Sequence, residues 1–261
     1  MINKIHCFGT SFTAGGGFEW DSVLKRDTLL ENYTEQPFSQ EHYSYPGQLQ
    51  KLVGDNIKVS NYGKSGYGNE RMYRNTYNII SESKNLDNQF FIFEFSHTGR
   101  KEIWSNTFNK YIIVNYYFND DGSHGIGGVA DRYFYNDREV SNKLRPLVDD
   151  FFKETIQLEA QFDLVKQNND MFIDYLLYNK INFLVVQEPF DHKTTEKIKP
   201  YTMDFGNGTR NMINYAFETK LTITDETNGK IEDLHCGLKG NRFIAQKIAK
   251  HLNLKIDLKM I

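Results

Sequence analysis

The sequence predicts an α/β protein in which helices cover both faces of a mostly parallel sheet. Strand-like and helix-like segments alternate along most of the chain, which is the order that crossover helices between parallel strands require. Several strand candidates are dense apolar runs, typical of strands that are buried on both faces. Polar or glycine-containing segments follow these runs directly, where α/β proteins carry their active sites.

The first part of the chain predicts two strands and a helix between them. Residues 4–8 are an apolar strand candidate that ends at Gly9. Residues 45–53 predict a helix that runs into a Gly-Asp-Asn turn, and residues 57–62 predict a second strand, closed by Gly63.

The middle of the chain changes character. Residues 69–83 predict a helix after a glycine-containing loop, and the apolar run 89–95 predicts the third strand. Residues 105–146 then combine aromatic and β-branched runs with an Asn-Asp-Asp-Gly turn and a glycine-rich stretch. We expect this segment to be an aromatic-rich insertion, a β-ribbon or a lid, within one domain that spans residues 1–261.

The last part of the chain returns to helices and strands. Residues 147–178 show helical periodicity, with Asn168-Asn169 as a candidate break. Residues 182–187 predict a fourth strand, residues 221–224 a short fifth strand, and residues 240–252 a terminal helix. The expected central sheet therefore has five strands.

Composition excludes several classes of protein. The chain has 261 residues, of which 39% are hydrophobic, enough for a substantial core. A net charge of −3 gives no electrostatic footprint for nucleic acid. No signal peptide and no run approaching the roughly 20 apolar residues of a membrane helix is visible. We therefore expect a cytoplasmic protein without a nucleic-acid or membrane partner; the oligomeric state stays open.

The two cysteines, Cys7 and Cys236, are too few for a disulfide framework. We expect two buried free thiols, as in a reducing compartment. They would come near one another if the two ends of the chain meet.

Gly9-Thr10-Ser11 places a serine just past the first strand, at the start of a helix. Backbone N–H groups there could hold an oxyanion, and Ser11 could be a nucleophile. The alternative is that Ser11 only caps the helix. A second motif, Asn61-Tyr62-Gly63-Lys64-Ser65-Gly66, follows the second strand, and Gly66 could offer its N–H to the same rim. A phosphate cradle and a plain turn are the alternatives there.

Glu232-Asp233-Leu234-His235 places carboxylates beside a histidine. A histidine that acts as a base needs an acceptor for its second ring nitrogen. An extended segment favours Asp233, because residues i and i+2 point the same way, whereas a tight turn favours Glu232. A surface histidine beside acidic neighbours is the simpler interpretation.

These three motifs together resemble the SGNH/GDSL hydrolases, in the right order and across nearly the whole chain. The resemblance implies a flavodoxin-like three-layer α/β/α sandwich. It also implies Ser11 as nucleophile, His235 as base, an acid just before it, and an oxyanion hole made of the N–H groups of Ser11 and Gly66.

The third motif of that family normally supplies an Asn side chain to the oxyanion hole, and this chain has none in the corresponding segment. Ser96, His97 or Thr98 could substitute for it. Arg100, a few residues on, could pair with Glu102 or grip an anionic group of the substrate. His97 and Glu188 are further candidates for substrate contact, although a solvated loop is the simpler role for Glu188.

The expected function is a serine esterase or acyltransferase that needs no cofactor and no metal. The histidines show no metal-ligand spacing, and His6 is expected in the core. The resemblance suggests a small O-acyl group as the substrate, such as acetyl on a carbohydrate. The alternatives are a binding or structural protein that keeps the fold without efficient chemistry, and phosphate-ester or nucleotide binding through Lys64 and Arg100.

Overall fold

The computed structural model describes residues 1–15, 43–64, 67–96, 99–106, 109–118, 124–130, 146, 158–188, 196–206, 208–224 and 231–256. At residues 231–235, in strand β9, the description covers the backbone alone.

The described central sheet consists of four parallel strands. They are β1 (Lys4–Phe8), β2 (Lys58–Asn61), β3 (Gln89–Glu94) and β7 (Phe183–Gln187), and their order across the sheet is β2-β1-β3-β7. This is the order of flavodoxin-like sheets, in which the first strand lies between the second and the third. The predicted fold class is confirmed.

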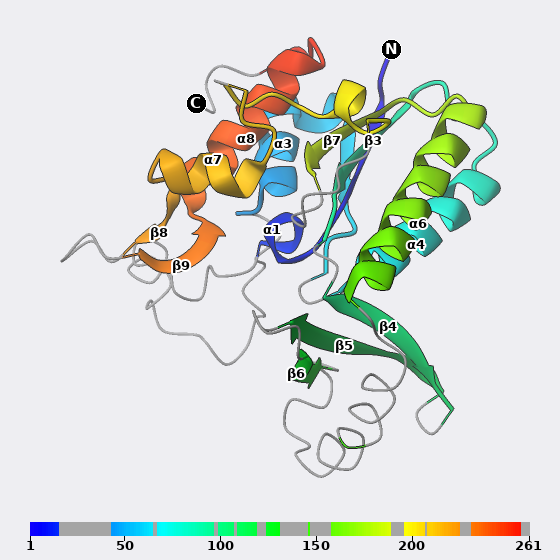
Figure 1. The fold of residues 1–261 in the computed structure, drawn as a ribbon. Helices are drawn as coiled ribbons and strands as arrows, with labels where there is room; N and C mark the ends of the chain where they lie inside the picture. The colour runs from blue at the N-terminus through cyan, green and yellow to red at the C-terminus, as the bar shows by residue number, and fades with distance from the viewer. Residues whose placement is uncertain are drawn as a thin grey trace.

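Helices cover both faces of this sheet (Figure 1). On one face lie α3 (Tyr45–Val53), α7 (Met212–Glu218) and α8 (Leu238–His251). On the other lie α4 (Asn69–Glu82) and α6 (Leu158–Tyr178). Short 3₁₀ turns occupy Gly54–Asn56 and Lys199–Tyr201.

The strand residues divide between two hydrophobic cores because successive side chains of a strand point to opposite faces. Ile5 and Cys7 of β1 join the core under α3 and α8, whereas Phe8 joins the core under α4 and α6. In β3, Ile92 likewise lies in the core under α3 and α8, whereas Phe91 and Phe93 lie in the core under α4 and α6. Apolar side chains are therefore buried on both faces of the sheet.

The prediction of a fifth strand in the central sheet is wrong. The segment forms β8 (Thr222–Thr224), which pairs antiparallel with β9 (Ile231–Cys236) in a separate two-stranded sheet. A strand this short carries no pattern that selects its partner. Among the described residues the central sheet has four strands rather than five.

The candidate helix break at Asn168-Asn169 is also wrong, since α6 continues through both residues. Asn169 is buried and accepts a hydrogen bond from the Tyr73 hydroxyl of α4. The polar side chain thus fixes the contact between two helices instead of ending one. Residues 147–157 of the expected helix lie outside the described residues.

A second, antiparallel sheet follows β3 in the chain and lies beyond one end of the central sheet (Figure 1). It consists of β4 (Arg100–Ser105), β5 (Lys110–Phe118) and β6 (His124–Ala130), and β4 contacts helix α4. The Arg74 guanidinium of α4 lies over the Tyr111 ring of β5, 4.2 Å from its centroid. The subdivision of the chain into one domain with a lid at 105–146 stays a prediction.

Within the described ranges, no helix is both long enough and apolar enough to cross a membrane.

Candidate active site

Ser11 lies where β1 runs into the short helix α1 (Ser11–Ala14), at the carboxyl end of the central sheet. The N-cap residue of α1 is Thr10, and its side chain makes no capping hydrogen bond. Ser11 occupies the first helical position and is buried, with 4% of its surface exposed. The interpretation of Ser11 as a helix cap is therefore wrong, and the nucleophile interpretation stays a prediction.

The carboxyl of Glu94, the last residue of β3, is hydrogen-bonded to this turn. It accepts hydrogen bonds from the hydroxyls of Thr10 and Thr13 and, at 2.7 Å, from the backbone N–H of Thr13. That N–H is one of those that a capping side chain normally satisfies at the start of a helix. A carboxylate from a neighbouring strand thus takes over the role of the cap.

The second motif packs against the same turn. The Asn61 amide donates to the Thr13 carbonyl at 2.8 Å, and the Asn61 amide oxygen accepts from the Gly63 N–H at 2.8 Å. A Cβ atom added to Gly63 would lie 2.5 Å from the Ala14 nitrogen, so only glycine lets the two segments approach. Gly66, the expected oxyanion donor, lies outside the described residues.

The C-terminal motif meets the N-terminal one: α1 is in contact with β9, which carries Asp233 and His235. Two pairs of β8 and β9 neighbours, Thr222–Cys236 and Ile223–Asp233, bracket a bulge of β9 that contains Leu234 and His235. Bulges beside active sites re-aim side chains. The alternation argument for Asp233 does not extend across this bulge, so Asp233 and Glu232 both stay candidates for the orienting acid.

The backbone just after His235 is fixed by the start of α8. The Asn241 amide donates to the carbonyl oxygens of Cys236 and Gly237 at 2.8 and 3.1 Å. The Gly237 N–H donates to the Leu221 carbonyl at 3.0 Å. These bonds anchor the C-terminal side of the histidine segment.

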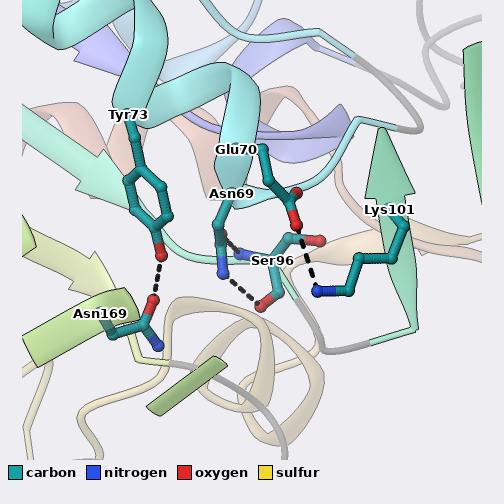
Figure 2. Close-up of polar contacts among 6 residues, drawn as sticks. All are labelled: Asn69, Glu70, Tyr73, Ser96, Lys101 and Asn169. Atoms are coloured by element: carbon teal, nitrogen blue, oxygen red, sulfur yellow. Dashed lines mark hydrogen bonds and ion pairs between the residues drawn. The ribbon is translucent and has the colours of Figure 1, made fainter. Parts of the chain in front are cut away.

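The third motif is held by Asn69, the first residue of α4. Asn69 accepts from the Ser96 N–H at 2.7 Å and donates to the Ser96 carbonyl at 3.4 Å (Figure 2). Ser96 is buried, and within the described part of the chain its hydroxyl has no hydrogen-bond partner. His97 and Thr98 lie outside the described residues.

Glu102, the candidate partner of Arg100, contacts a different arginine. Glu102 forms an ion pair with Arg74 of α4 at 2.8 Å, and its side chain is almost fully buried. Burial raises the pKa of the Glu94 carboxyl, and the charge of Arg100 acts against that shift. Glu188 follows β7 and is partly buried, and its backbone carbonyl accepts from the Gln187 amide at 3.1 Å.

His6 is a core residue, as expected. It is fully buried, hydrogen-bonds Gln89 at 2.8 Å and stacks on Phe91, and burial lowers its pKa to about 4. Cys7 and Cys236 are both free and buried in one core, which confirms the expectation of two buried thiols. Burial raises the pKa of Cys236 to about 12 and that of Cys7 further.

Sequence reasoning missed the roles of Glu94 and Asn69. Glu94 did carry a signal, since an acidic residue inside an apolar strand has to find hydrogen-bond donors in the fold. Asn69 carried none, because an Asn at a helix start normally indicates a local cap. No three His, Cys, Asp or Glu side chains gather as candidate metal ligands among those described.

No family model matches this sequence, and no curated protein matches it significantly. Two solved structures are similar along nearly their whole length. One is a protein of the G-D-S-L family from Desulfitobacterium hafniense DCB-2, with 14% identity and a TM-score of 0.39, covering 95% of this chain and 98% of that chain. The other is a member of the lipolytic protein G-D-S-L family from Veillonella parvula DSM 2008, with 13% identity and a TM-score of 0.39, covering 96% and 98%. Both likenesses are too distant to add evidence of activity, so an assignment has to come from the geometry of this chain.

Proposed function

We propose that this protein is a serine-dependent esterase or acyltransferase, with Ser11 as nucleophile and His235 as general base. The observation that carries the proposal is the contact between α1 and β9, which brings residues from opposite ends of the chain to the carboxyl edge of one sheet. A hydroxyl nucleophile, a base and an orienting acid are the groups that acyl transfer needs.

In the proposed reaction His235 takes the Ser11 proton while the Ser11 oxygen attacks the ester carbonyl. Asp233 orients the imidazole and stabilises its protonated form, with Glu232 as the alternative acid. His235 then returns the proton to the leaving alcohol. Water, or an acceptor hydroxyl, attacks the acyl-enzyme and releases the acyl group.

The negative charge of the tetrahedral intermediate needs preorganised donors. We assign these to the N–H groups of Ser11 and Gly66 and to the Ser96 hydroxyl. Ser96 is preferred to Thr98 for two reasons. Asn69 hydrogen-bonds both the N–H and the carbonyl of Ser96, which fixes the Ser96 backbone. The Ser96 hydroxyl is buried and has no hydrogen-bond partner among the described residues. A fixed donor needs no reorganisation during the reaction.

The proposed substrate is a small O-acyl ester, with acetyl on a carbohydrate as the first class to test. Arg100, His97 and Glu188 are the proposed substrate contacts, since all three follow strands at the edge that carries Ser11.

A fluorophosphonate probe tests the proposal, because it labels only an activated serine. We expect the unsubstituted chain to be labelled and to hydrolyse p-nitrophenyl acetate, and Ser11→Ala to do neither. Ser81→Ala is the matched control, since its exposed hydroxyl bonds a carbonyl near the end of α4. Labelling that survives Ser11→Ala would refute the nucleophile, and an unlabelled native chain would favour a protein that binds without catalysis.

A further inference from the structure

The nucleophile turn, residues 9–13, rests on a buried carboxylate that no part of the proposed reaction uses. Glu94 ends a strand in which the four preceding residues are apolar, and it is 2% exposed. Burying a carboxylate in such a place is costly unless donors surround it. Among the described residues, the hydrogen bonds to this carboxyl come from Thr10 and Thr13 of the turn.

The bonds of Glu94 bracket Ser11. One carboxylate oxygen accepts from the Thr10 hydroxyl, just before Ser11, and the other accepts from the hydroxyl and the N–H of Thr13, two residues after it. Residues on both sides of Ser11 are thereby tied to the end of β3, through the Thr10 side chain before it and through the backbone and side chain of Thr13 after it. Hydrogen bonds to an ionised carboxylate are shorter and stronger than neutral ones, so these bonds are strongest when Glu94 is deprotonated.

The same carboxyl is also tightly packed. A Cβ atom added to Gly9 would collide with both Glu94 and Thr13, so no side chain larger than hydrogen fits between turn and carboxyl. The Thr13 hydroxyl lies 3.3 Å from the Tyr45 hydroxyl of α3, which extends the network into the core. The turn is therefore in contact with both β3 and α3.

We propose that Glu94 is a positioning residue for catalysis: its carboxyl sets the backbone of the nucleophile turn and thereby aims the Ser11 hydroxyl and N–H at the substrate carbonyl. The inference rests on the proposed function. Glu94 acts through the turn, and its bonds go to the neighbours of Ser11. Misplacing a reacting group by about 1 Å can cost about 10²-fold in rate.

The test measures the rate constant of fluorophosphonate labelling and kcat and KM for p-nitrophenyl acetate in the full chain. We expect Glu94→Gln to lower the labelling rate constant and kcat by about 10- to 100-fold, with KM and the final labelled fraction unchanged. A merely structural role would lower the labelled fraction and leave the rate constant of the folded molecules intact.

Thr10→Val is the second variant, because it removes one of the bonds and leaves the carboxyl in place. We expect it to slow labelling as well, and the double variant Thr10→Val/Glu94→Gln to be less impaired than two independent effects predict. Thr76→Val is the matched control: its buried hydroxyl bonds the Met72 carbonyl within α4.

The two possible failures are distinguishable. Full-rate labelling of Glu94→Gln and Thr10→Val, beside a labelled native chain, overturns the positioning role alone. A native chain that is not labelled, or a Ser11→Ala variant that is, overturns the proposed function and this inference with it.

Discussion

At the scale of single residues, Glu94 combines two opposing effects on one carboxyl. Burial raises its pKa, while the donors of Thr10 and Thr13 and the nearby charge of Arg100 act to lower it. Burial is the larger effect, so the folded protein holds the Glu94 proton to a higher pH than the unfolded chain does. The same residue that orders the turn therefore makes stability depend on pH.

The pH dependence follows from the sign of that shift. Above the ordinary carboxyl pKa the unfolded chain loses the proton that the folded protein still holds, so stability falls as pH rises through the raised pKa of Glu94. We expect the free energy of unfolding of the native chain, minus that of Glu94→Gln, to fall over this window by at most about 1.4 kcal/mol per pH unit. Urea unfolding at a series of pH values from 4 upward measures it.

Comparing the two proteins removes other titrating groups, among them His6. The lowered pKa of His6 makes its contribution run the other way, since stability is lost as pH falls from its ordinary value of 6.5 toward 4. A difference that is flat with pH would show that Glu94 titrates alike in both states.

Ser96 allows a second test at this scale. If its hydroxyl is the third oxyanion donor, Ser96→Ala removes a contact made mainly in the transition state. We expect kcat for p-nitrophenyl acetate to fall by about 10²-fold with little change in KM. Thr98→Ala is the informative comparison: a larger loss of kcat there than in Ser96→Ala would move the donor to Thr98.

At the scale of elements, the sequence predicts segments with a regular pattern and fails where contacts break the pattern. All four strands of the central sheet and helices α3, α4 and α8 lie within a few residues of their expected bounds. The sequence does not predict β9 as a strand, because a strand with bulges has no regular alternation of apolar and polar residues. The expected break at Asn168-Asn169 failed because tertiary hydrogen bonding satisfies Asn169 inside a continuous helix.

The contact between α1 and the second motif predicts that adding one methyl group at Gly63 lowers stability and slows labelling. Gly63→Ala would place a Cβ atom against the backbone of Thr13 and Ala14. We expect a loss of about 1–3 kcal/mol in the free energy of unfolding, because close-packed backbone cannot yield without moving α1. We also expect slower labelling by the fluorophosphonate per folded molecule, since α1 carries Ser11.

Gly54→Ala separates these two effects. Gly54 has φ of 63° at the end of α3, with nothing within 4 Å of an added Cβ atom. It should lose stability through backbone strain and keep the native labelling rate. Equal labelling rates in both variants would show that Gly63 supports the fold but not the nucleophile turn.

At the scale of the whole molecule, the topology accounts for the part of the site that sequence could predict. Parallel strands β1 and β3 end at the same edge, so Ser11 and Ser96 follow from their places after those strands. The supporting contacts of Glu94 with Thr10 and Thr13, and of Asn69 with Ser96, join residues far apart in sequence. The sequence has no local pattern that identifies these partners, so only the folded structure reveals the contacts.

The two thiols report whether the ends of the chain open together. Cys7 of β1 and Cys236 of β9 are buried in the same core, and burial raises the pKa of both. A thiol that is buried and protonated does not react with a disulfide reagent. We therefore expect that Ellman's reagent at pH 8 does not modify either thiol while the protein is folded. Both thiols should react only when the protein unfolds, at one common rate equal to the unfolding rate.

Variants with one cysteine, Cys7→Ala and Cys236→Ala, assign the rate to each thiol. If the contact between α1 and β9 is part of the cooperative core, the thiol of each variant should react with Ellman's reagent at the rate at which that variant unfolds. The esterase activity of each variant should be lost at the same rate. Reaction of Cys236 ahead of unfolding would mean that the C-terminal segment detaches while β1 stays folded. In that case the contact between α1 and β9 would be transient, and labelling by the fluorophosphonate should slow in proportion to the fraction of detached molecules.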